Sequence, residues 1–390
     1  MTNGSGRFPA YVPDAHAAVI AKLLEAGAVV VGKAHLYEFA YGRPHPTLGW
    51  TRNPLRPDRL PGGSSSGSAA GIAAGFALGS IGTDSAGSVR VPASFCGVAG
   101  FKPTAGRLGL DGITPLAPSL DHAGVLARTC EDAALLFAAL DERAGLNAAR
   151  PTPRTPRKPT IGVATDYMEA TAEPEIRDAA ANAVRTMENA GFRVKRLNTG
   201  LPIRDVKEKT WTILHYEAYR THAEMLADWA EGYSDGLRRS FELGRSITEA
   251  EYAACLSWRD EHRPAVDKLF EGIDALVSPT CPVTAGPIPA GKPGGPANGE
   301  FTPLASMGLA GLVAARRLLP GRHADRPAAY RTAGRRRTRA GDRRPLRAPC
   351  KSGHKAIRRA RQGTEGIGKN QKDTENVDML QGRSVQSVFL

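Results

Sequence analysis

The sequence predicts an α/β fold, in which helices pack on the faces of a sheet. Short apolar runs typical of strands alternate along the chain with longer segments whose apolar residues recur at helical spacing. The chain has 390 residues, of which 41% are hydrophobic and 23% charged, so it can bury a large core. This composition is typical of a globular protein.

The first predicted elements are a helix and a strand near the N-terminus. Asp14 can cap a helix in which Val19 and Leu23 belong to an apolar face, and Gly27 is a residue type that ends helices. The run of alanine and valine at 28–31 follows directly. We therefore expect a helix that leads into a buried strand.

The next elements are built from small residues and a capping motif. Residues 62–77 are almost all glycine, serine and alanine, which predicts a loop followed by a tightly packed interior helix. Thr129 and Asp132 form a capping box before a helix at 133–140, and 150–159 is a connector rich in proline and arginine.

The same alternation returns after the connector, which supports the α/β interpretation for the second half of the chain. Thr248 and Glu251 form a capping box at the start of a long helix that reaches Phe270. The other elements that we expect here are a strand at 160–164, a helix at 174–190, and strands at 192–197 and 274–278.

The positive charge of the chain lies almost entirely in its last part. The formal net charge is +13, but residues 308–390 alone carry 20 basic and 6 acidic residues, and residues 1–307 carry 32 and 33. The arginine-rich segment 308–390 has few aromatic residues and no sustained periodicity, so we expect it to be a disordered tail. A nucleic-acid partner is not favoured, because the tail contains no known binding module.

Cysteine and histidine patterns give no support for a disulfide framework or a metal site. The five cysteines are an odd number without a CxxC pair, and the nine histidines show no HExxH spacing. The N-terminus lacks the layout of a signal peptide, and the small-apolar stretch 69–81 is too short to span a bilayer. We expect a cytoplasmic protein with no metal, no cofactor and no membrane partner.

Two glycine-rich turns that carry serines hold the most informative chemistry. The first is Gly62-Gly63-Ser64-Ser65-Ser66-Gly67-Ser68-Ala69-Ala70, and the second is Gly82-Thr83-Asp84-Ser85-Ala86-Gly87-Ser88-Val89-Arg90-Val91-Pro92. A serine becomes a nucleophile when a base accepts its proton, and acyl transfer also needs backbone N–H donors for the oxyanion. Composition alone leaves a linker or an anion-binding loop equally open.

The whole block 62–93 resembles the amidase signature in order and spacing. The resemblance extends through residues 2–307, including Gly32–Ala40, Thr51–Pro54, Cys96–Thr104, Ser119–Asp121 and Ser278–Thr280. It implies the fold of that family, a mixed twisted sheet with helices on both faces. It also implies a domain at 1–307, incomplete at its N-terminus, and a tail at 308–390 that does not match the family.

The resemblance implies a role for several residues of the two turns. Ser88 matches the nucleophile that forms the acyl-enzyme, and Ser64 matches the serine that follows a cis peptide bond and relays the proton. The N–H groups around Ser88 match the oxyanion hole, and further side chains match supporting positions. The oxyanion set is Ser85, Ala86 and Gly87, and the supporting set is Ser65, Asp84 and Arg90.

The base of the family is a lysine on an earlier strand, and no segment of this chain matches it. Lys33 matches a different family lysine, so we interpret it as structural. The expectation is that activity is weak or absent unless another group, such as His122 or Lys102, takes over the base role.

These observations leave several functions open. The main prediction is hydrolysis of a small amide to a carboxylate and ammonia or an amine. The alternatives are an inactive remnant of such an enzyme and a glutamyl-tRNA amidotransferase component of the A type, which would have a partner subunit. A homodimer also stays open, as does the origin of 308–390, which a shifted reading frame could explain.

Overall fold

The computed structural model describes residues 2–6, 12–141, 158–229 and 232–291, together with two short strands at 311–313 and 388–389. Residues 1–316 and 380–390 form one compact unit, and the second unit, 317–379, lies outside the described residues. The predicted tail 308–390 is therefore described only in those two strands.

A six-stranded antiparallel sheet forms the centre of the first unit, with the order β1-β9-β2-β4-β3-β8. Residue 81 of β2 lies opposite residue 125 of β4, and residue 101 of β3 also lies opposite residue 125. The strands are β1 (Gly32–Lys33), β2 (Gly79–Thr83), β3 (Ala99–Lys102), β4 (Ala123–Ala127), β8 (Gly311–Val313) and β9 (Val388–Phe389).

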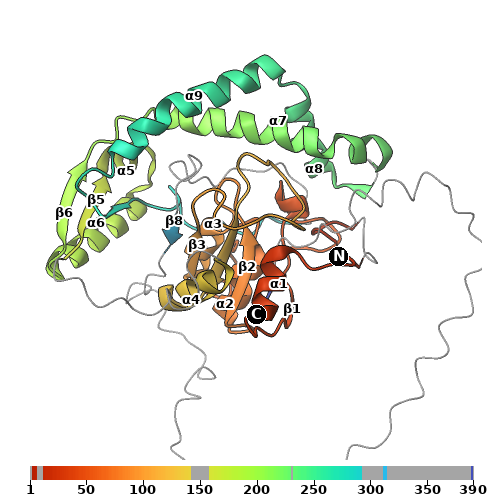
Figure 1. The fold of residues 1–390 in the computed structure, drawn as a ribbon, viewed down its shortest axis with the longest axis horizontal. Helices are drawn as coiled ribbons and strands as arrows, with labels where there is room; N and C mark the ends of the chain where they lie inside the picture. The colour runs from red at the N-terminus through yellow and green to blue at the C-terminus, as the bar shows by residue number, and fades with distance from the viewer. Residues whose placement is uncertain are drawn as a thin grey trace, which may run out of the picture. The chain divides into compact units, whose positions relative to one another are not determined.

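Helices cover both faces of this sheet (Figure 1). On one face, Val125 of β4 packs with α1 (Ala18–Glu25) and α4 (Cys130–Leu140). On the other face, Leu126 packs with α2 (Ser66–Ala74) and α3 (Arg90–Cys96). Neighbouring residues of one strand thus enter opposite cores, as the alternation of side chains along a strand requires.

A smaller parallel sheet follows, with the order β6-β5-β7. Its strands are β5 (Thr160–Ala164), β6 (Arg193–Leu197) and β7 (Ala275–Val277), and the helices that connect β5 to β6 are α5 (Thr165–Thr171) and α6 (Pro174–Asn189). Pro174 lies in the first turn of α6, where a missing N–H costs no helical hydrogen bond. The α/β prediction and its strands in this region are confirmed.

Three further helices pack together beside the small 3₁₀ helix η1 (Glu38–Ala40). They are α7 (Ile203–Trp229), α8 (Asp235–Arg245) and α9 (Glu249–Lys268). Phe39 and Tyr41 join their apolar core, together with Ala86 from the serine turn. This core connects the helical segment directly to the turn that carries Ser88.

The capping box predicted at Thr248 is confirmed, the one predicted at Thr129 is confirmed for one of its two hydrogen bonds, and the cap predicted at Asp14 is wrong. The Thr248 and Glu251 capping box is present, and the Thr129 hydroxyl accepts from the Asp132 N–H at 3.1 Å. The first helix, however, begins at Ala18 after an Ala17 cap, so Asp14 is not its cap. The predicted buried strand at 28–31 is also absent, because β1 begins only at Gly32.

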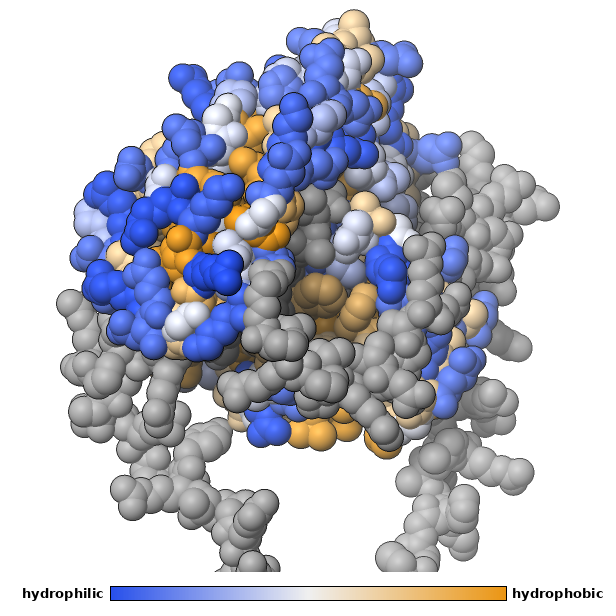
Figure 2. Space-filling model, turned by 60° about the vertical axis from the view of Figure 1, so that its left-hand side comes forward, coloured by the Kyte–Doolittle hydropathy of each residue, from blue (hydrophilic) through white to orange (hydrophobic). Residues whose placement is uncertain are grey.

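Those residues before β1 are exposed instead of buried. Val29 is 74% exposed and Val31 is 63% exposed, and Phe76 and Leu78, just before β2, are 76% and 69% exposed. The face of the molecule in Figure 2 is mainly hydrophilic with separate hydrophobic patches. Exposed apolar residues therefore precede both β1 and β2, and large exposed apolar patches often mark contact surfaces.

Replacing Gly67 with alanine is expected to destabilise the fold. A Cβ at residue 67 would lie 2.5 Å from the backbone nitrogen and 2.6 Å from the carbonyl oxygen of His35. Both are backbone atoms, which cannot move aside as the end of a flexible side chain can. Overpacking of this kind costs about 1–3 kcal/mol.

Gly286→Ala is the matched control, because nothing lies within 4 Å of its added Cβ. Urea unfolding of both variants checks the prediction. Equal midpoints for the two variants would contradict the close approach of α2 to His35.

Candidate active site

The two serine turns meet in the structure at the end of β2. The first turn precedes α2 and contains the cis peptide bond between Gly63 and Ser64, which the resemblance implied. The Ser65 N–H donates to the Ser88 carbonyl oxygen at 3.1 Å. The Ser65 hydroxyl donates to the Thr83 carbonyl oxygen at 3.3 Å. Ser65 therefore joins both turns through its backbone and its side chain.

Ser88 differs from its neighbours in exposure. All residues from Gly79 to Ala93 are buried except Ser88, which is partly exposed, and Ser64 is only 4% exposed. A single accessible hydroxyl on an otherwise buried turn is the arrangement that a nucleophile needs, because the substrate must reach it while the supporting groups stay fixed.

The turn is held by a buried ion pair between Asp84 and Arg90. Asp84 is fully buried and Arg90 is 3% exposed, and two side-chain hydrogen bonds of 2.6 and 2.8 Å join them. The same carboxylate accepts from the backbone N–H groups of Gly87 at 2.7 Å and Val89 at 3.1 Å. Burial opposes ionisation of Asp84, but the Arg90 charge and these donors keep its pKa below the usual range.

The backbone donors of the turn are not equivalent. The Gly87 N–H points to Asp84 Oδ1, so this predicted oxyanion donor is already engaged. Gly87 has a φ of +130°, a conformation that favours glycine and bends the chain before Ser88. No hydrogen bond from the Ser85 or Ser88 N–H is present among the described residues.

The Asp121 carboxyl contacts the same turn through Ser85. Its carboxyl accepts from the Ser85 hydroxyl at 2.5 Å and from the N–H groups of Leu116 and Ala117 at 2.8 and 3.1 Å. Burial raises the pKa of Asp121 to about 6, although these three donors act in the opposite direction. Asp121 thus links Ser85 to the loop that follows residue 115.

Asp121→Asn is expected to change how stability depends on pH. A carboxyl whose pKa is about 6 in the folded chain and about 3.9 in the unfolded chain binds more protons when folded between these values. Wild-type stability therefore falls by roughly 2–3 kcal/mol more than variant stability as pH rises from about 4 to about 6.

The exposed Asp111 provides the matched control, since its carboxyl also lines the pocket described below. Urea unfolding at several pH values compares Asp121→Asn, Asp111→Asn and the wild type. If the difference in unfolding free energy between the wild type and Asp121→Asn stayed constant from pH 4 to pH 6, the pKa of Asp121 would not be raised in the folded chain.

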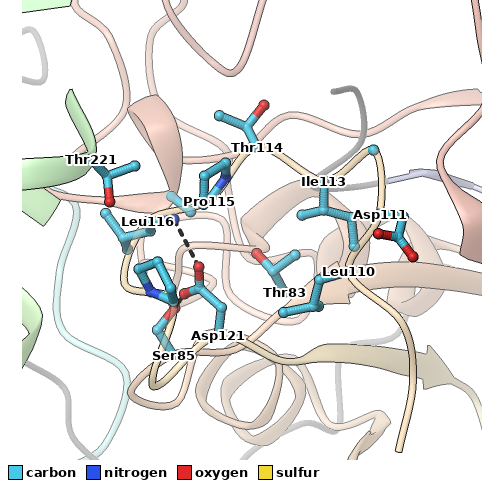
Figure 3. A pocket seen from close by; sticks show the side chains of 13 residues that line it. Thr83, Ser85, Leu110, Asp111, Ile113, Thr114, Pro115, Leu116, Asp121 and Thr221 are labelled. Carbon is cyan, nitrogen blue, oxygen red and sulfur yellow. Dashed lines mark hydrogen bonds between the residues drawn. The ribbon is translucent and has the colours of Figure 1, made fainter. Parts of the chain in front are cut away.

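A cavity of about 560 Å³ opens beside Ser85 and Asp121 (Figure 3). Figure 3 shows the Asp121 carboxyl beneath Leu116, with Ser85 next to it and Thr221 of α7 across the cavity. Ser85 of the serine turn lines the cavity, whereas Ser64 and Ser88 are not among its lining residues. The lining is Ala40, Thr83, Ser85, Leu110, Asp111, Gly112, Ile113, Thr114, Pro115, Leu116, Pro118, Asp121 and Thr221.

The two residues that the sequence left open as substitute bases both lie in the interior near the turn. Lys102 is 1% exposed, its Nζ donates to the Pro103 carbonyl oxygen at 2.9 Å, and burial lowers its pKa to about 8. His122 is 8% exposed, and its pKa is lowered by burial and by the Lys102 charge. Lys33, in contrast, is an exposed residue of β1.

The ring of His122 has one paired and one unpaired nitrogen. Nδ1 lies 2.7 Å from the Leu120 carbonyl oxygen, and the buried Nε2 has no hydrogen-bond partner among the described residues. A neutral ring that donates from Nδ1 carries its lone pair on Nε2. His122 can therefore act as a proton acceptor in this tautomer.

Sequence reasoning missed two residues that shape the site. The resemblance includes Asp121 only as part of Ser119-Leu120-Asp121 and implies no separate role for its carboxylate. Glu217 of α7 was not noted; it accepts from the Ser119 N–H at 2.9 Å and the Tyr252 hydroxyl at 2.7 Å. Nothing in its local sequence distinguishes Glu217 from an exposed helix residue.

Within the described part of the chain, no cluster of three or more histidine, cysteine or acidic residues could hold a metal ion. The helices described are also all too short or too polar to cross a lipid bilayer.

Comparisons with known proteins show the family to which the chain belongs. The Amidase family model matches residues 1–298. An amidase from Pseudomonas putida is 35% identical over 71% of this chain, which spans about three fifths (61%) of that relative. The A subunit of the glutamyl-tRNA(Gln) amidotransferase of Natronomonas pharaonis is 34% identical, with 72% of this chain and 75% of the relative covered.

Solved structures give the same result. A crystal structure of an amidase superposes with a TM-score of 0.69 and 32% identity, covering 80% of this chain and 72% of the other. A family model that matches most of the chain, the common fold and the paired serine turns all lead to one assignment. The chain belongs to the amidase signature family.

Proposed function

We propose that this protein hydrolyses a carboxylic amide through an acyl-enzyme on Ser88. The Ser88 hydroxyl attacks the amide carbonyl, the C–N bond breaks, and the amine or ammonia leaves with a proton. Water then attacks the ester, which releases the carboxylate and restores the serine. The observation that carries the proposal is the partly exposed Ser88 on a turn whose other residues are buried.

The oxyanion of this reaction would be stabilised by backbone N–H groups of the turn. We assign the Ser85 and Ser88 N–H groups as the donors, with Ala86 and Gly87 shaping the bend between them. The Asp84 carboxylate supports this arrangement, because it fixes Gly87, Val89 and Arg90 at the same time. Donors fixed before the reaction need no reorganisation when the negative charge develops.

The proton of Ser88 would pass through Ser64, the buried serine after the cis peptide bond. The base beyond Ser64 is tested by Lys102→Met and His122→Gln, with Lys33→Met as the control for an exposed lysine. If either group is the base, its loss lowers the hydrolytic rate by about 10²-fold or more. A rate unchanged by both substitutions excludes both from the proton path.

The cavity lining supports an uncharged or cationic substrate. It contains two carboxyl groups, those of Asp111 and Asp121, and no lysine, arginine or histidine among the residues that line it. An anionic substrate group would lack a counter-ion here. Ammonia release from a series of amides of similar size, with neutral, cationic and anionic side chains, tests this. Preference for the anionic member would contradict it.

A component of a glutamyl-tRNA(Gln) amidotransferase is the second candidate, because this chain covers 75% of the Natronomonas pharaonis relative. Such a component would release ammonia from an amide for use by a partner. Purification of the native protein under mild conditions distinguishes the two functions. Stoichiometric recovery of a second protein favours the amidotransferase, and recovery of the single chain with amide turnover favours the free amidase.

A catalytically inactive family member is the third candidate. It predicts a folded chain that neither turns over amides nor reacts with a serine-directed phosphonate. Hydrogen exchange identifies the folded state independently of activity. An unreactive Ser88 in a chain with a protected central sheet would therefore overturn the hydrolase proposal.

A further inference from the structure

The end of β3 brings a buried lysine close to the serine turn. The strands β2 and β3 both run antiparallel to β4, so the last residues of β2 and β3 and the first residue of β4 lie at the same end of the sheet. Asp84 directly follows β2 there, His122 directly precedes β4, and Lys102 is the last residue of β3. The Asp84 N–H donates to the His122 carbonyl oxygen at 2.9 Å. Three neighbouring strands thus place ionisable residues where the serine turn begins.

Lys102 also lies on the sheet face that the turn covers. Residues two positions apart on a strand share a face, so Lys102 lies on the same face as Gly100. A Cβ at Gly100 would lie 3.1 Å from the Val89 carbonyl oxygen, and a Cβ at Gly124 would lie 3.1 Å from a Val89 methyl group. Val89 directly follows Ser88. The face that carries Lys102 is therefore packed against the residue next to the proposed nucleophile.

The buried charges at this end of the sheet do not cancel. The Asp84 carboxylate is already matched by the Arg90 guanidinium, which donates two hydrogen bonds to it. Lys102 is only 1% exposed, and its Nζ donates to an uncharged group, the Pro103 carbonyl oxygen, at 2.9 Å. Among the described residues, Asp84 is the one carboxylate whose charge acts on Lys102. When Lys102 is protonated, this buried set carries one net positive charge.

We infer that protonated Lys102 is a positioning residue that stabilises the oxyanion at the Ser88 turn electrostatically, and that it does not act as the base. This inference rests on the proposed acyl-enzyme on Ser88. A negative charge that develops at the turn meets an excess cation in the protein interior, where charges interact more strongly than in water. The same cation attracts Asp84, whose carboxylate orients the Gly87 and Val89 N–H groups.

The two roles open to Lys102 predict opposite pH profiles. Burial lowers the pKa of Lys102 to about 8, although the Asp84 charge acts in the opposite direction. A base must be neutral before it can accept a proton, so the rate would rise as the pH passes through about 8. A stabilising cation must keep its proton, so the rate falls over the same interval. The sign of the change near pH 8 therefore distinguishes the two roles.

The other described groups that face the turn titrate outside this interval. Burial raises the pKa of Asp121 to about 6 and that of Tyr167 on α5 to about 12. Burial and the Lys102 charge lower the pKa of His122 below its usual value, so its ring is neutral near pH 8. Asp84 stays ionised despite its burial, because its pKa lies below the usual range. A change of rate near pH 8 that disappears with Lys102 thus reports this lysine.

The test measures how fast an alkyl fluorophosphonate labels Ser88 between about pH 7 and pH 10. The serine oxygen bonds to phosphorus, fluoride leaves, and the phosphoryl oxygen takes the place of the oxyanion. The wild-type rate is expected to fall about tenfold through pH 8, because one charge is lost. Lys102→Met is expected to react about tenfold more slowly at neutral pH and to show no such fall.

Two further variants make the test specific. Lys102→Arg keeps its charge throughout this pH range, so it is expected to retain most of the wild-type rate and to lose the fall. Lys33→Met removes an exposed lysine of the same sheet and is expected to follow the wild-type profile. Urea unfolding at neutral pH shows which variants are folded. If Lys102→Arg does not fold, the comparison of the wild type with Lys102→Met still decides the sign.

Each contrary result has a distinct meaning. A wild-type rate that rises through pH 8, with Lys102→Arg unreactive at every pH, would make Lys102 the base and overturn the inference. Identical profiles for the wild type and Lys102→Met would show that Lys102 supports only the fold, which also overturns it. A folded wild type that is never labelled would instead overturn the proposed function, and the inference with it.

Discussion

Replacing Ser88 with alanine is expected to abolish turnover of any amide that the protein hydrolyses. The substitution removes the one accessible hydroxyl of the turn from Gly79 to Ala93 and leaves its buried neighbours in place. Loss of the nucleophile in a serine hydrolase lowers the rate by about 10⁴-fold or more, because only oxyanion stabilisation and binding remain. Ammonia release under saturating amide measures the effect.

Ser94→Ala is the matched control, because Ser94 is an exposed serine on the neighbouring helix α3. Its turnover is expected to equal that of the wild type. Both variants are expected to unfold at the wild-type urea concentration, which separates a chemical effect from a loss of fold. Equal turnover by Ser88→Ala and the wild type would remove Ser88 from the mechanism.

Replacing Asp84 with asparagine is expected to cause the largest loss of stability. The fully buried carboxylate pairs with Arg90, which is 3% exposed, so the substitution leaves a buried guanidinium without its counter-charge. Breaking one side of a buried ion pair typically costs about 3–5 kcal/mol. The free energy of urea unfolding at neutral pH checks this value.

A double variant separates stability from chemistry. Asp84→Leu combined with Arg90→Met removes both buried charges, and such apolar replacements often recover most of the lost stability. Turnover is expected to stay low, since the Gly87 and Val89 N–H groups lose the carboxylate that orients them. Full recovery of turnover would show that Asp84 supports only the fold.

The exposed pair Arg204–Glu208 on α7 gives the scale for comparison. Its side chains are 88% and 61% exposed, so Glu208→Gln is expected to change stability by less than about 1 kcal/mol. An equal loss of unfolding free energy in Glu208→Gln and Asp84→Asn would contradict the larger stability contribution expected of the buried pair.

Local signals in the sequence predicted the elements that depend on neighbouring residues. The Thr248 and Glu251 capping box requires only residues three positions apart, and it is present at the start of α9. The strand at 160–164 has the predicted bounds because its apolar run matches a buried parallel strand. The amidase signature likewise lies within one continuous block, so the serine turns could be identified from it.

Features that depend on distant residues could not be predicted in the same way. The alanine and valine run at 28–31 is apolar enough for a buried strand, but burial requires a packing partner, and Val29 and Val31 are exposed. The contact of Ser85 with Asp121 joins residues 36 positions apart. Asp121 could be matched to the family, yet its hydrogen bonds to Ser85 and to the loop at 116–117 depend on the tertiary fold.

The last strand illustrates the same limit. Residues 308–390 have the arginine-rich composition of a disordered segment, and composition describes a whole segment rather than its final residues. Val388 and Phe389 nevertheless pair with β1 and β2, which lie more than 300 residues earlier. Pairing over such a separation leaves no local pattern in the sequence.

The central claim is that Ser88 is an activated nucleophile, and a fluorophosphonate tests it most directly. The full chain is incubated with the reagent, digested, and the modified residue is identified by mass spectrometry, with Ser88→Ala and Ser64→Ala treated in parallel. The account predicts one adduct on Ser88, none in Ser88→Ala and a much slower reaction in Ser64→Ala. A folded chain that stays unlabelled, or an adduct on another serine, would contradict it.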